Sequence, residues 1–404
     1  MRKRREGRPA RGMAFLTALL MAFLMISGGA EAIYGIGSKG QEIKEIKIRL
    51  QELRYIERGN LTGKYTENTA ESVREFQKRN GLEATGTVDG QTWEKLFSQE
   101  AVPMPRATMI PLRPEATPTP PEIPQADADG FLTGAGEEYI YEDDENGLWI
   151  YLSASLQVRI SRKKDASIPL VWFETEIRTR EGEAFRTAMT DWDRPGQKFQ
   201  YPYIISREEK YVLGFSDDFF AERMSKGYTV GIIIRDGRII SDMTNRDQGY
   251  HLPNLDMMAQ YPDGRLEVYA CNERTAEEML ADGAVNVFSF GPILLRAGEI
   301  NEGLYTHWRD TEPRHALGMI EPGHYLLISI QGRTKESKGA PLQRVAEMMR
   351  DAGVQQALNL DGGNTMALVF RGRMLNKLAT YKRKQFVRTV TSLIGIGTTQ
   401  RQEE

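Results

Sequence analysis

A short run of residues near the C-terminal end combines a carboxylate with two glycines in a pattern that could support chemistry. Asp361 follows the strand-like run 354–360 and precedes Gly362 and Gly363. Adjacent glycines let the backbone pass close to a ligand, and α/β proteins often place functional carboxylates just after a strand. A plain turn that uses Asp and Gly for their backbone preferences explains the same letters. The run alone therefore leaves both interpretations open.

The segment before this run has the pattern of a helix. Apolar residues recur at helical spacing over 341–350, namely Leu342, Val345, Met348 and Met349. Pro341 suits a first helical turn, and Gly353 suits the left-handed position that ends a helix. We expect a helix, a short strand and a turn, with Asp361 at the end of the strand.

Two upstream segments complete a set of motifs. They read Pro-Arg-His-Ala-Leu-Gly at 313–318 and Ser-Phe-Gly-Pro at 289–292, and Asn-Leu-Asp-Gly-Gly follows at 359–363. In this order the three segments resemble the phosphodiester glycosidase family (uncovering-enzyme-like domain), and the resemblance covers roughly residues 205–397. The set is fairly specific, whereas Asp-Gly-Gly by itself is not.

This resemblance implies hydrolysis of a sugar joined through a phosphodiester. Such a reaction needs a group that holds the phosphate and a carboxylate that attacks or activates water. Arg314 is the expected phosphate ligand, because a guanidinium fork matches phosphate oxygens; a structural ion pair is its alternative. Asp361 is the first expected carboxylate, and Asp218 in the Asp-Phe-Phe segment is the second. Which of them is nucleophile, acid or base stays open.

The chain departs from the family pattern around these residues. His315 replaces a small hydroxyl residue, and it either adds an acid–base group or fills space. Ser216 and Asp217 replace an Asn-Gly pair before Asp218. The two adjacent acids either bind a divalent cation such as Ca²⁺ or Mg²⁺, or cap a helix that starts at Phe219. We assign no metal ligand and no cofactor, and the divalent cation stays the open alternative.

Further residues are expected to bind substrate. They are Gly362, Gly363, Asn364 and Thr365 of the Asp-Gly-Gly loop, Ser289 and Gly291 of the Ser-Phe-Gly-Pro segment, and His315. Asn364 and Thr365 can donate hydrogen bonds to a sugar or a phosphate. A tight turn at the end of a strand is the alternative for Ser289 and Gly291.

Residues 34–98 have the pattern of a compact helical unit. Apolar faces at helical spacing predict three helices, over about 43–53, over 66–80 and from Asp89 onward. The runs at 40–46, 73–82 and 85–89 resemble the peptidoglycan-binding-domain type that is common at the ends of wall enzymes. That resemblance implies attachment to peptidoglycan without catalysis. A helical spacer without a ligand is the alternative.

The first 32 residues differ from the rest in composition. Six basic residues precede an apolar run over 13–27, and Ala30-Glu31-Ala32 offers a cleavage site. We interpret 1–32 as a secretory signal peptide cleaved after Ala32, with an uncleaved anchor as the alternative. Removing it moves the formal charge from −3 to −7, which argues against a nucleic-acid partner. Cys271 is the only cysteine, so no internal disulfide can form, which suits a bacterial envelope.

The remaining chain divides into a linker and a second domain. Residues 99–137 hold eight of the 18 prolines, which predicts an extended linker. Residues 138–404 show alternating strand patterns, with hairpin signals such as Asp236-Gly237. We predict the α+β class: a small three-helix N-terminal domain over 34–98 and a mixed α/β, strand-rich C-terminal domain of catalytic type over 138–404.

These observations exclude some enzyme classes. The chain has four histidines, no zinc-type His spacing and no phosphate loop, which argues against zinc amidases and peptidases. We predict a secreted, cell-wall-associated hydrolase of the bacterial envelope that cleaves a sugar from a phosphodiester in wall or extracellular glycans. Its expected partners are peptidoglycan, through 34–98, and the glycan substrate; no stable membrane anchor is expected. The alternative is a non-catalytic glycan-binding or exopolysaccharide-assembly module tethered to peptidoglycan.

Overall fold

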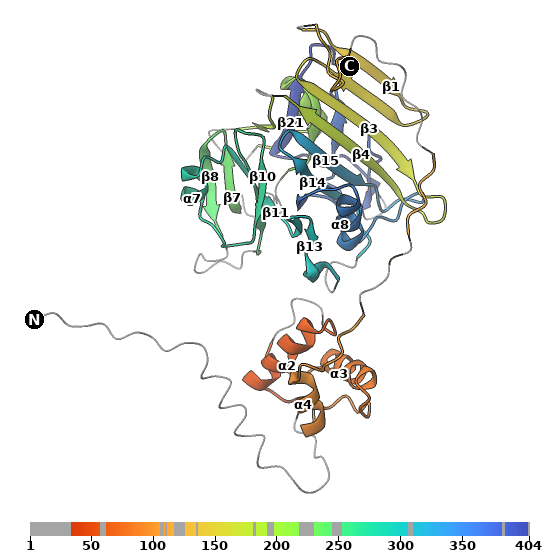
Figure 1. Cartoon of the computed structure of the whole chain (residues 1–404), viewed down its shortest axis with the longest axis vertical. Helices are drawn as coiled ribbons and strands as arrows, with labels where there is room; N and C mark the ends of the chain where they lie inside the picture. The colour runs from red at the N-terminus through yellow and green to blue at the C-terminus, as the bar shows by residue number, and fades with distance from the viewer. Residues whose placement is uncertain are drawn as a thin grey trace, which may run out of the picture. The chain divides into compact units, whose positions relative to one another are not determined.

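The computed structural model describes most of the chain after residue 33. The described residues are 34–56, 62–105, 109, 111–116, 126–134, 136–180, 183–191, 198–217, 230–244, 253–305, 310–381 and 384–402. The chain divides into two compact units, Met1–Arg106 and Ala107–Glu404, which are described separately (Figure 1). The expected signal peptide at 1–32 and Asp218 lie outside the described residues.

The first unit is helical. It contains α2 (Gln41–Glu52), α3 (Glu67–Arg79) and α4 (Gly90–Phe97). Asp89 caps α4 by accepting a hydrogen bond from the Thr92 N–H at 2.7 Å, as a capping residue should. Ile46, Val73 and Leu96, one from each helix, meet in the core of this unit. The helical N-terminal domain is therefore confirmed.

Two segments of the proline-rich stretch pack on the second unit. The Arg113 N–H donates to Asp165 Oδ2 at 2.5 Å, and Pro114 pairs with Asp165 in an isolated bridge. Phe131 is buried and carries the Arg180 guanidinium over its ring. The second unit thus begins before residue 138, because these segments contribute apolar and polar contacts to it.

A nine-stranded antiparallel sheet forms the largest part of the second unit. Its order is β1-β2-β3-β4-β15-β14-β16-β12-β13. The strands are Tyr139–Asp143, Leu148–Leu152, Leu156–Lys164, Val171–Thr179, His324–Ile330, Arg314–Glu321, Gln356–Leu360, Ile293–Arg296 and Glu299–Ile300. In its centre β14 pairs with β16, so that His315 lies opposite Leu360. This pairing brings the start of β14 beside the end of β16.

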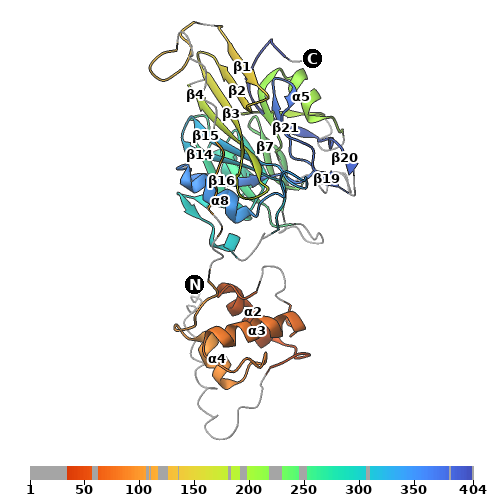
Figure 2. The same cartoon turned by 90° about the vertical axis from the view of Figure 1, so that its right-hand side faces the viewer.

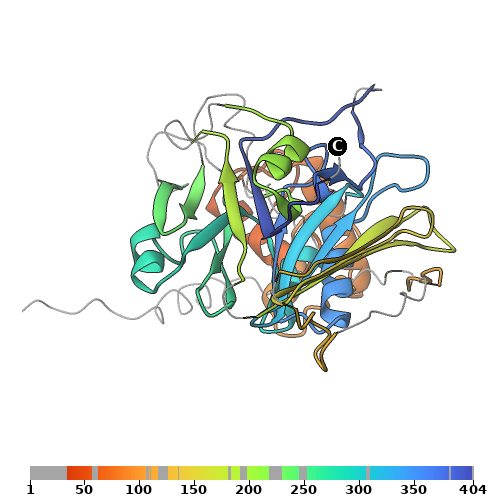
Figure 3. The same ribbon diagram turned by 90° about the horizontal axis from the view of Figure 1, so that it is seen from above.

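The second unit also contains two five-stranded sheets. One has the order β10-β9-β11-β7-β8, and the other β18-β17-β6-β21-β5. The first comprises Leu266–Tyr269, Asp256–Gln260, Asn286–Phe290, Gly231–Arg235 and Arg238–Met243; the second comprises Arg373–Met374, Leu368–Phe370, Tyr211–Phe215, Ser392–Thr398 and Arg186–Met189. Viewed from above, the green and teal strands of the first lie at one end of the unit and the yellow strands of the nine-stranded sheet at the other (Figure 3).

The remaining elements are short. They are the two-stranded pair β19 (Thr380–Tyr381) and β20 (Lys384–Gln385), the helices α5 (Pro202–Glu208), α7 (Ala276–Ala281) and α8 (Leu342–Asp351), and the 3₁₀ helix η2 (Glu302–Tyr305). Asp236 and Gly237 join β7 to β8, and both have positive φ angles, of 49° and 69°. Positive φ at both central residues is what a two-residue hairpin turn requires, so this predicted hairpin is confirmed.

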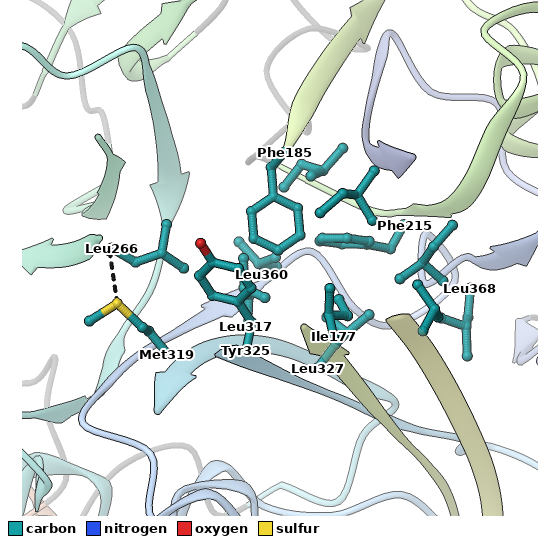
Figure 4. Packing of buried hydrophobic residues seen from close by; sticks show 14 of the residues in the cluster. Ile177, Phe185, Phe215, Leu266, Leu317, Met319, Tyr325, Leu327, Leu360 and Leu368 are labelled. Carbon is teal, nitrogen blue, oxygen red and sulfur yellow. Dashed lines mark hydrogen bonds between the residues drawn. The ribbon is translucent and has the colours of Figure 1, made fainter. Parts of the chain in front are cut away.

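Two apolar clusters hold the second unit together. In the first, side chains from all three large sheets meet, among them Phe215 of β6, Leu266 of β10 and Leu360 of β16 (Figure 4). In the second, α8 covers the nine-stranded sheet with Leu342, Val345, Ala346 and Met349 (Figure 2). Full burial of each large apolar side chain is worth about 1.5–3 kcal/mol. The α+β class is confirmed, and the core fixes the position of β16 and the loop after it.

Candidate functional site

The Asp-Gly-Gly loop lies against the start of β14. The Gly363 N–H donates to the Pro313 carbonyl oxygen at 3.0 Å, and the Asp361 N–H donates to the Asp217 carbonyl oxygen at 3.1 Å. A Cβ at Gly362 would lie 2.5 Å from the Pro313 oxygen, and Gly363 has φ of 56°. Both glycines therefore meet a steric or backbone requirement. The predicted turn after the strand is confirmed.

This loop forms one wall of a pocket of about 310 Å³. The lining residues are Phe290, Glu312, Pro313, Arg314, Arg333, Asn359, Leu360, Asp361, Gly362, Gly363, Asn364 and Arg388. Ligand sites generally measure roughly 300–1,000 Å³, so this pocket is at the small end of that range. It brings Arg314 and Asp361, both expected from the sequence, into one concavity.

Arg314 lines the pocket, and two backbone carbonyl oxygens accept hydrogen bonds from its guanidinium group. Its Nε donates to the Ala340 carbonyl at 3.0 Å, and its Nη2 donates to the Asp310 carbonyl at 2.8 Å. Burial lowers the pKa of Arg314 to about 10, an effect that the negative charge of Glu312 opposes. Arg314 therefore stays protonated at neutral pH. No carboxylate of the described residues forms an ion pair with it, which does not support the alternative of a structural ion pair.

Arg333 is a pocket residue that the sequence interpretation missed. Its Nε donates to Glu312 Oε2 at 2.6 Å, and its Nη1 donates to Asn364 Oδ1. Arg333 comes three residues after the end of β15, a placement similar to that of Asp361 after β16. This position shortly after a strand was the feature of the sequence that could have indicated Arg333 as a pocket residue. The ion pair with Glu312 holds Arg333 beside the Asp-Gly-Gly loop, and Asn364 acts as its anchor.

Arg388 is a second missed cation. It lines the pocket, and its Nη1 donates to Thr365 Oγ1 at 3.1 Å. Thr365 itself is buried and does not line the pocket. The structure thus gives Thr365 the role of positioning Arg388. No periodic pattern around residue 388 could have indicated this placement.

Besides Thr365, three further residues expected to bind substrate lie outside the pocket lining. His315 is fully buried in β14, and its Nδ1 lies 3.0 Å from Ser329 Oγ. Burial lowers the pKa of His315 to about 3, so the ring is neutral and fills space near Phe215. Strand alternation is the reason, because His315 points to the opposite side from Arg314. Its burial therefore favours the alternative in which His315 fills space over the one in which it adds an acid–base group.

Ser289 and Gly291 are the other two. Ser289 is buried, and its Oγ donates to the Ile232 carbonyl at 2.6 Å. Gly291 precedes a cis peptide bond to Pro292, and its N–H donates to the Asn359 carbonyl at 3.0 Å. The residue between them, Phe290, lines the pocket instead. The turn interpretation describes Ser289 and Gly291 better than substrate contact does.

Of the acidic pair at 217–218, only Asp217 belongs to the described residues. Asp218 lies outside the described residues. The buried carboxylate of Asp217 lies 3.5 Å from Arg235 Nη2 on β7, so it is part of a buried ion pair. Across the described part of the chain, no group of three or more His, Cys, Asp or Glu side chains is arranged to hold a metal ion. Asp217 therefore acts through its carbonyl and its ion pair rather than as a pocket carboxylate.

The described part of the pocket has a distinct chemistry. Three guanidinium groups and the two carboxylates of Asp361 and Glu312 surround the same space. Guanidinium groups bind phosphate oxygens through charge-assisted hydrogen bonds. A carboxylate beside such a site can attack an anomeric carbon or activate water. The arrangement can hold an anion and present Asp361 to an adjacent atom.

Comparisons with known proteins support the two recognised domains. Residues 209–397 match the family model described as phosphodiester glycosidase, and residues 39–96 match one described as "Putative peptidoglycan binding domain". The resemblance of a phosphodiester glycosidase domain preceded by a peptidoglycan-binding domain is therefore confirmed. In the described residues, no helix combines the length and the hydrophobicity that a membrane crossing needs.

Relatives and solved structures are more distant. The SPbeta prophage-derived uncharacterized protein YomE of Bacillus subtilis (strain 168) is 27% identical over 170 residues, 41% of this chain and 26% of that protein. This chain thus spans about a quarter of that relative's length. The catalytic domain of zebrafish N-acetylglucosamine-1-phosphodiester alpha-N-acetylglucosaminidase, auto-inhibited by its pro-peptide, is 19% identical with a TM-score of 0.48, covering 66% of this chain and 90% of that one. A hypothetical protein from Synechocystis is 14% identical with a TM-score of 0.43, covering 66% and 64%.

Proposed function

We propose that this chain, which carries a phosphodiester glycosidase domain behind a peptidoglycan-binding domain, is a cell-wall-associated hydrolase. It releases a sugar from a phosphodiester linkage in wall or extracellular glycans, such as teichoic-acid-like polymers. The observation that carries this proposal is the shared pocket of Arg314 and Asp361. Arg314 forms no ion pair with a carboxylate of the described residues, and Asp361 directly follows β16 in a loop that two backbone hydrogen bonds hold in place.

The reaction follows from these two groups. A phosphodiester is a monoanion, and Arg314 holds its non-bridging oxygens. The bond between the anomeric carbon and its oxygen breaks, and the electron pair leaves with the phosphate. Water supplies a hydroxyl to the sugar and a proton to the solution, so the products are a free sugar and a phosphomonoester. A phosphomonoester is a fair leaving group, so a strong general acid matters less here.

The role of Asp361 has two forms. As a nucleophile it forms a glycosyl ester that water then hydrolyses, and the anomeric configuration is retained. As a base it removes a proton from the attacking water, and the configuration is inverted. The second carboxylate expected from the sequence is Asp218, which lies outside the described residues. Glu312 is engaged by Arg333, so we assign Glu312 a positioning role.

The first unit supports the proposed location. Its match to a peptidoglycan-binding domain favours attachment to the wall, and residues 1–32 favour secretion. Attachment keeps the second unit close to wall glycans and raises their effective concentration. We therefore place the protein in the bacterial envelope, with peptidoglycan as the partner of the first unit and the glycan as substrate of the second.

The test is hydrolysis of synthetic sugar-1-phosphodiesters by the purified chain. Asp361→Asn and Arg314→Gln should each lower kcat/KM by at least about 100-fold, because each removes a group that acts on the reacting atoms. Asp263→Asn and Arg178→Gln are matched controls, because both side chains are exposed and neither lines the pocket. The controls should keep wild-type activity.

No release from a panel of sugars, with and without Ca²⁺ or Mg²⁺, would overturn the proposed hydrolase. Binding of the same diesters without turnover would then identify the second unit as a non-catalytic glycan-binding module.

A further inference from the structure

Asn359 is a pocket residue whose carboxamide has a fixed orientation. It is the next-to-last residue of β16, lines the pocket and is 3% exposed. Its Nδ2 donates to the Gly291 carbonyl at 2.9 Å. The backbone groups of Asn359 also pair with the Gly291–Pro292 turn, at 3.0 and 3.2 Å. Because a carbonyl accepts only from the amide nitrogen, this contact determines which end of the carboxamide is Oδ1.

The other end of this carboxamide is unsatisfied. Asn359 Oδ1 is buried and accepts no hydrogen bond from any residue that the structure describes. Several described residues carry such a buried atom, yet Asn359 alone among them also lines the pocket. A buried acceptor without a donor costs about 1–3 kcal/mol, and such atoms are rare in folded proteins. A ligand that brings a donor to this atom recovers that loss.

The chemistry of the proposed substrate decides which part of it can be the donor. A phosphodiester at neutral pH has only acceptor oxygens, so it cannot satisfy Oδ1. A sugar carries hydroxyl groups, and an amino sugar carries N–H groups, and both donate. Asn359 precedes Asp361 by two residues at the end of the same strand. A sugar placed for attack at its anomeric carbon by Asp361 therefore lies within the pocket that Asn359 lines.

We propose that Asn359 is a specificity-determining residue, whose Oδ1 accepts a hydrogen bond from one hydroxyl or N–H group of the departing sugar. The inference rests on the proposed function and deepens it, since it names the part of the substrate that the site reads. A site built to bond a substrate donor rejects analogues that lack it by as much as 10⁴–10⁵-fold. Asn359 imposes this selection on the sugar, and Arg314 imposes the requirement for phosphate.

The experiment pairs changes in the protein with changes in the sugar. The substrates are a sugar-1-phosphodiester and its monodeoxy analogues, one ring position at a time. The proteins are the wild-type chain, Asn359→Ala and Asn359→Asp. In the wild type, one position should show a loss in kcat/KM of about 100-fold or more when its donor is removed. In Asn359→Ala, removing the same donor from the sugar should lower kcat/KM by less than about threefold, because this variant has no Oδ1 for the donor to bond.

A matched control separates selection from packing. Asn376 is a buried asparagine outside the pocket, and its Oδ1 accepts from the Leu368 N–H at 2.8 Å. Asn376→Ala should lower stability and leave the ranking of the deoxy analogues unchanged. Asn359→Asp keeps an oxygen acceptor but cannot donate to the Gly291 carbonyl, so it should retain more of the selectivity for the same ring position than Asn359→Ala and less than the wild type.

A binding arm separates this inference from the proposed function. Calorimetric titration with the sugar-1-phosphate and its deoxy analogues needs no turnover. If the chain hydrolyses no diester yet binds these ligands with the Asn359-dependent preference, the hydrolase proposal fails and the inference stands. Equal losses at every ring position in wild type and Asn359→Ala, or no binding and no turnover at all, would overturn the inference.

Discussion

Gly362 approaches Pro313 so closely that an added Cβ would lie 2.5 Å from the Pro313 carbonyl oxygen. This approach joins the loop after β16 to the residue that precedes Arg314. The Gly363 N–H bonds the same oxygen at 3.0 Å. One carbonyl thus fixes the position of Asp361 relative to Arg314, and the pocket depends on the absence of a side chain at residue 362.

Gly362→Ala should therefore disturb the site directly. Overpacking against a backbone atom costs about 1–3 kcal/mol of unfolding free energy, and a small displacement of Asp361 should lower activity by about 100-fold. Gly90→Ala in α4 is the control, since nothing lies within 4 Å of its Cβ position. Urea unfolding and kcat/KM measure both effects. Wild-type activity in Gly362→Ala would show that the close approach does not position Asp361.

Arg333→Lys tests the second guanidinium. A lysine keeps the charge but cannot bond Glu312 and Asn364 simultaneously through a planar fork. We expect KM for the diester to rise by about tenfold, since loss of one charge-assisted bond is worth about 1.5 kcal/mol. Arg178→Lys on the exposed side of β4 should leave KM unchanged. An unchanged KM in Arg333→Lys would assign Arg333 to structure alone.

The buried ion pair of Asp217 and Arg235 should govern stability. The two side chains are 6% and 1% exposed, and removing one partner of such a pair costs about 3–5 kcal/mol. Asp217→Asn should thus be strongly destabilising. The double variant Asp217→Asn/Arg235→Met should be less destabilised than the sum of the two single variants. Additive losses in urea unfolding would show that the two groups do not interact.

His315 should make stability depend on pH. Its pKa is about 3 in the folded chain and 6.5 for an unperturbed histidine, so the unfolded chain binds more protons between these values. Stability then falls as pH decreases below 6.5, by up to about 1.4 kcal/mol per pH unit. His315→Thr should remove this part of the slope between pH 6 and 4, whereas His324→Gln should keep it. Equal slopes in wild type and His315→Thr would contradict the buried neutral ring.

The fold was largely readable because its elements have strong local signals. Asp236-Gly237 requires positive φ at both positions, and Gly353 ends α8 with φ of 85°. The docking of Phe131 and Pro114 on the second unit was not readable, because a proline-rich composition predicts an extended chain whether or not it packs. Contacts between segments far apart in sequence leave no local pattern, as the pairing of Arg113 with Asp165 illustrates.

The site was readable only in part for the same reason. Arg314 and Asp361 belong to motifs, and they lie in one pocket. Arg333 and Arg388 belong to no motif, and only the folded chain brings them there. His315 was assigned to the pocket from its position in the family motif, yet strand alternation turns its side chain into the core. The side chains of adjacent residues in a strand point to opposite faces of the sheet.

We expect the chain to break the bond between the sugar and the phosphate oxygen, with Asp361 acting at the anomeric carbon. Hydrolysis of a sugar-1-phosphodiester in ¹⁸O-labelled water tests this most directly, with Asp361→Asn as the inactive control. Mass spectrometry should find the label in the free sugar and none in the phosphomonoester. Label in the phosphate would show cleavage at phosphorus, and would rule out attack at the anomeric carbon.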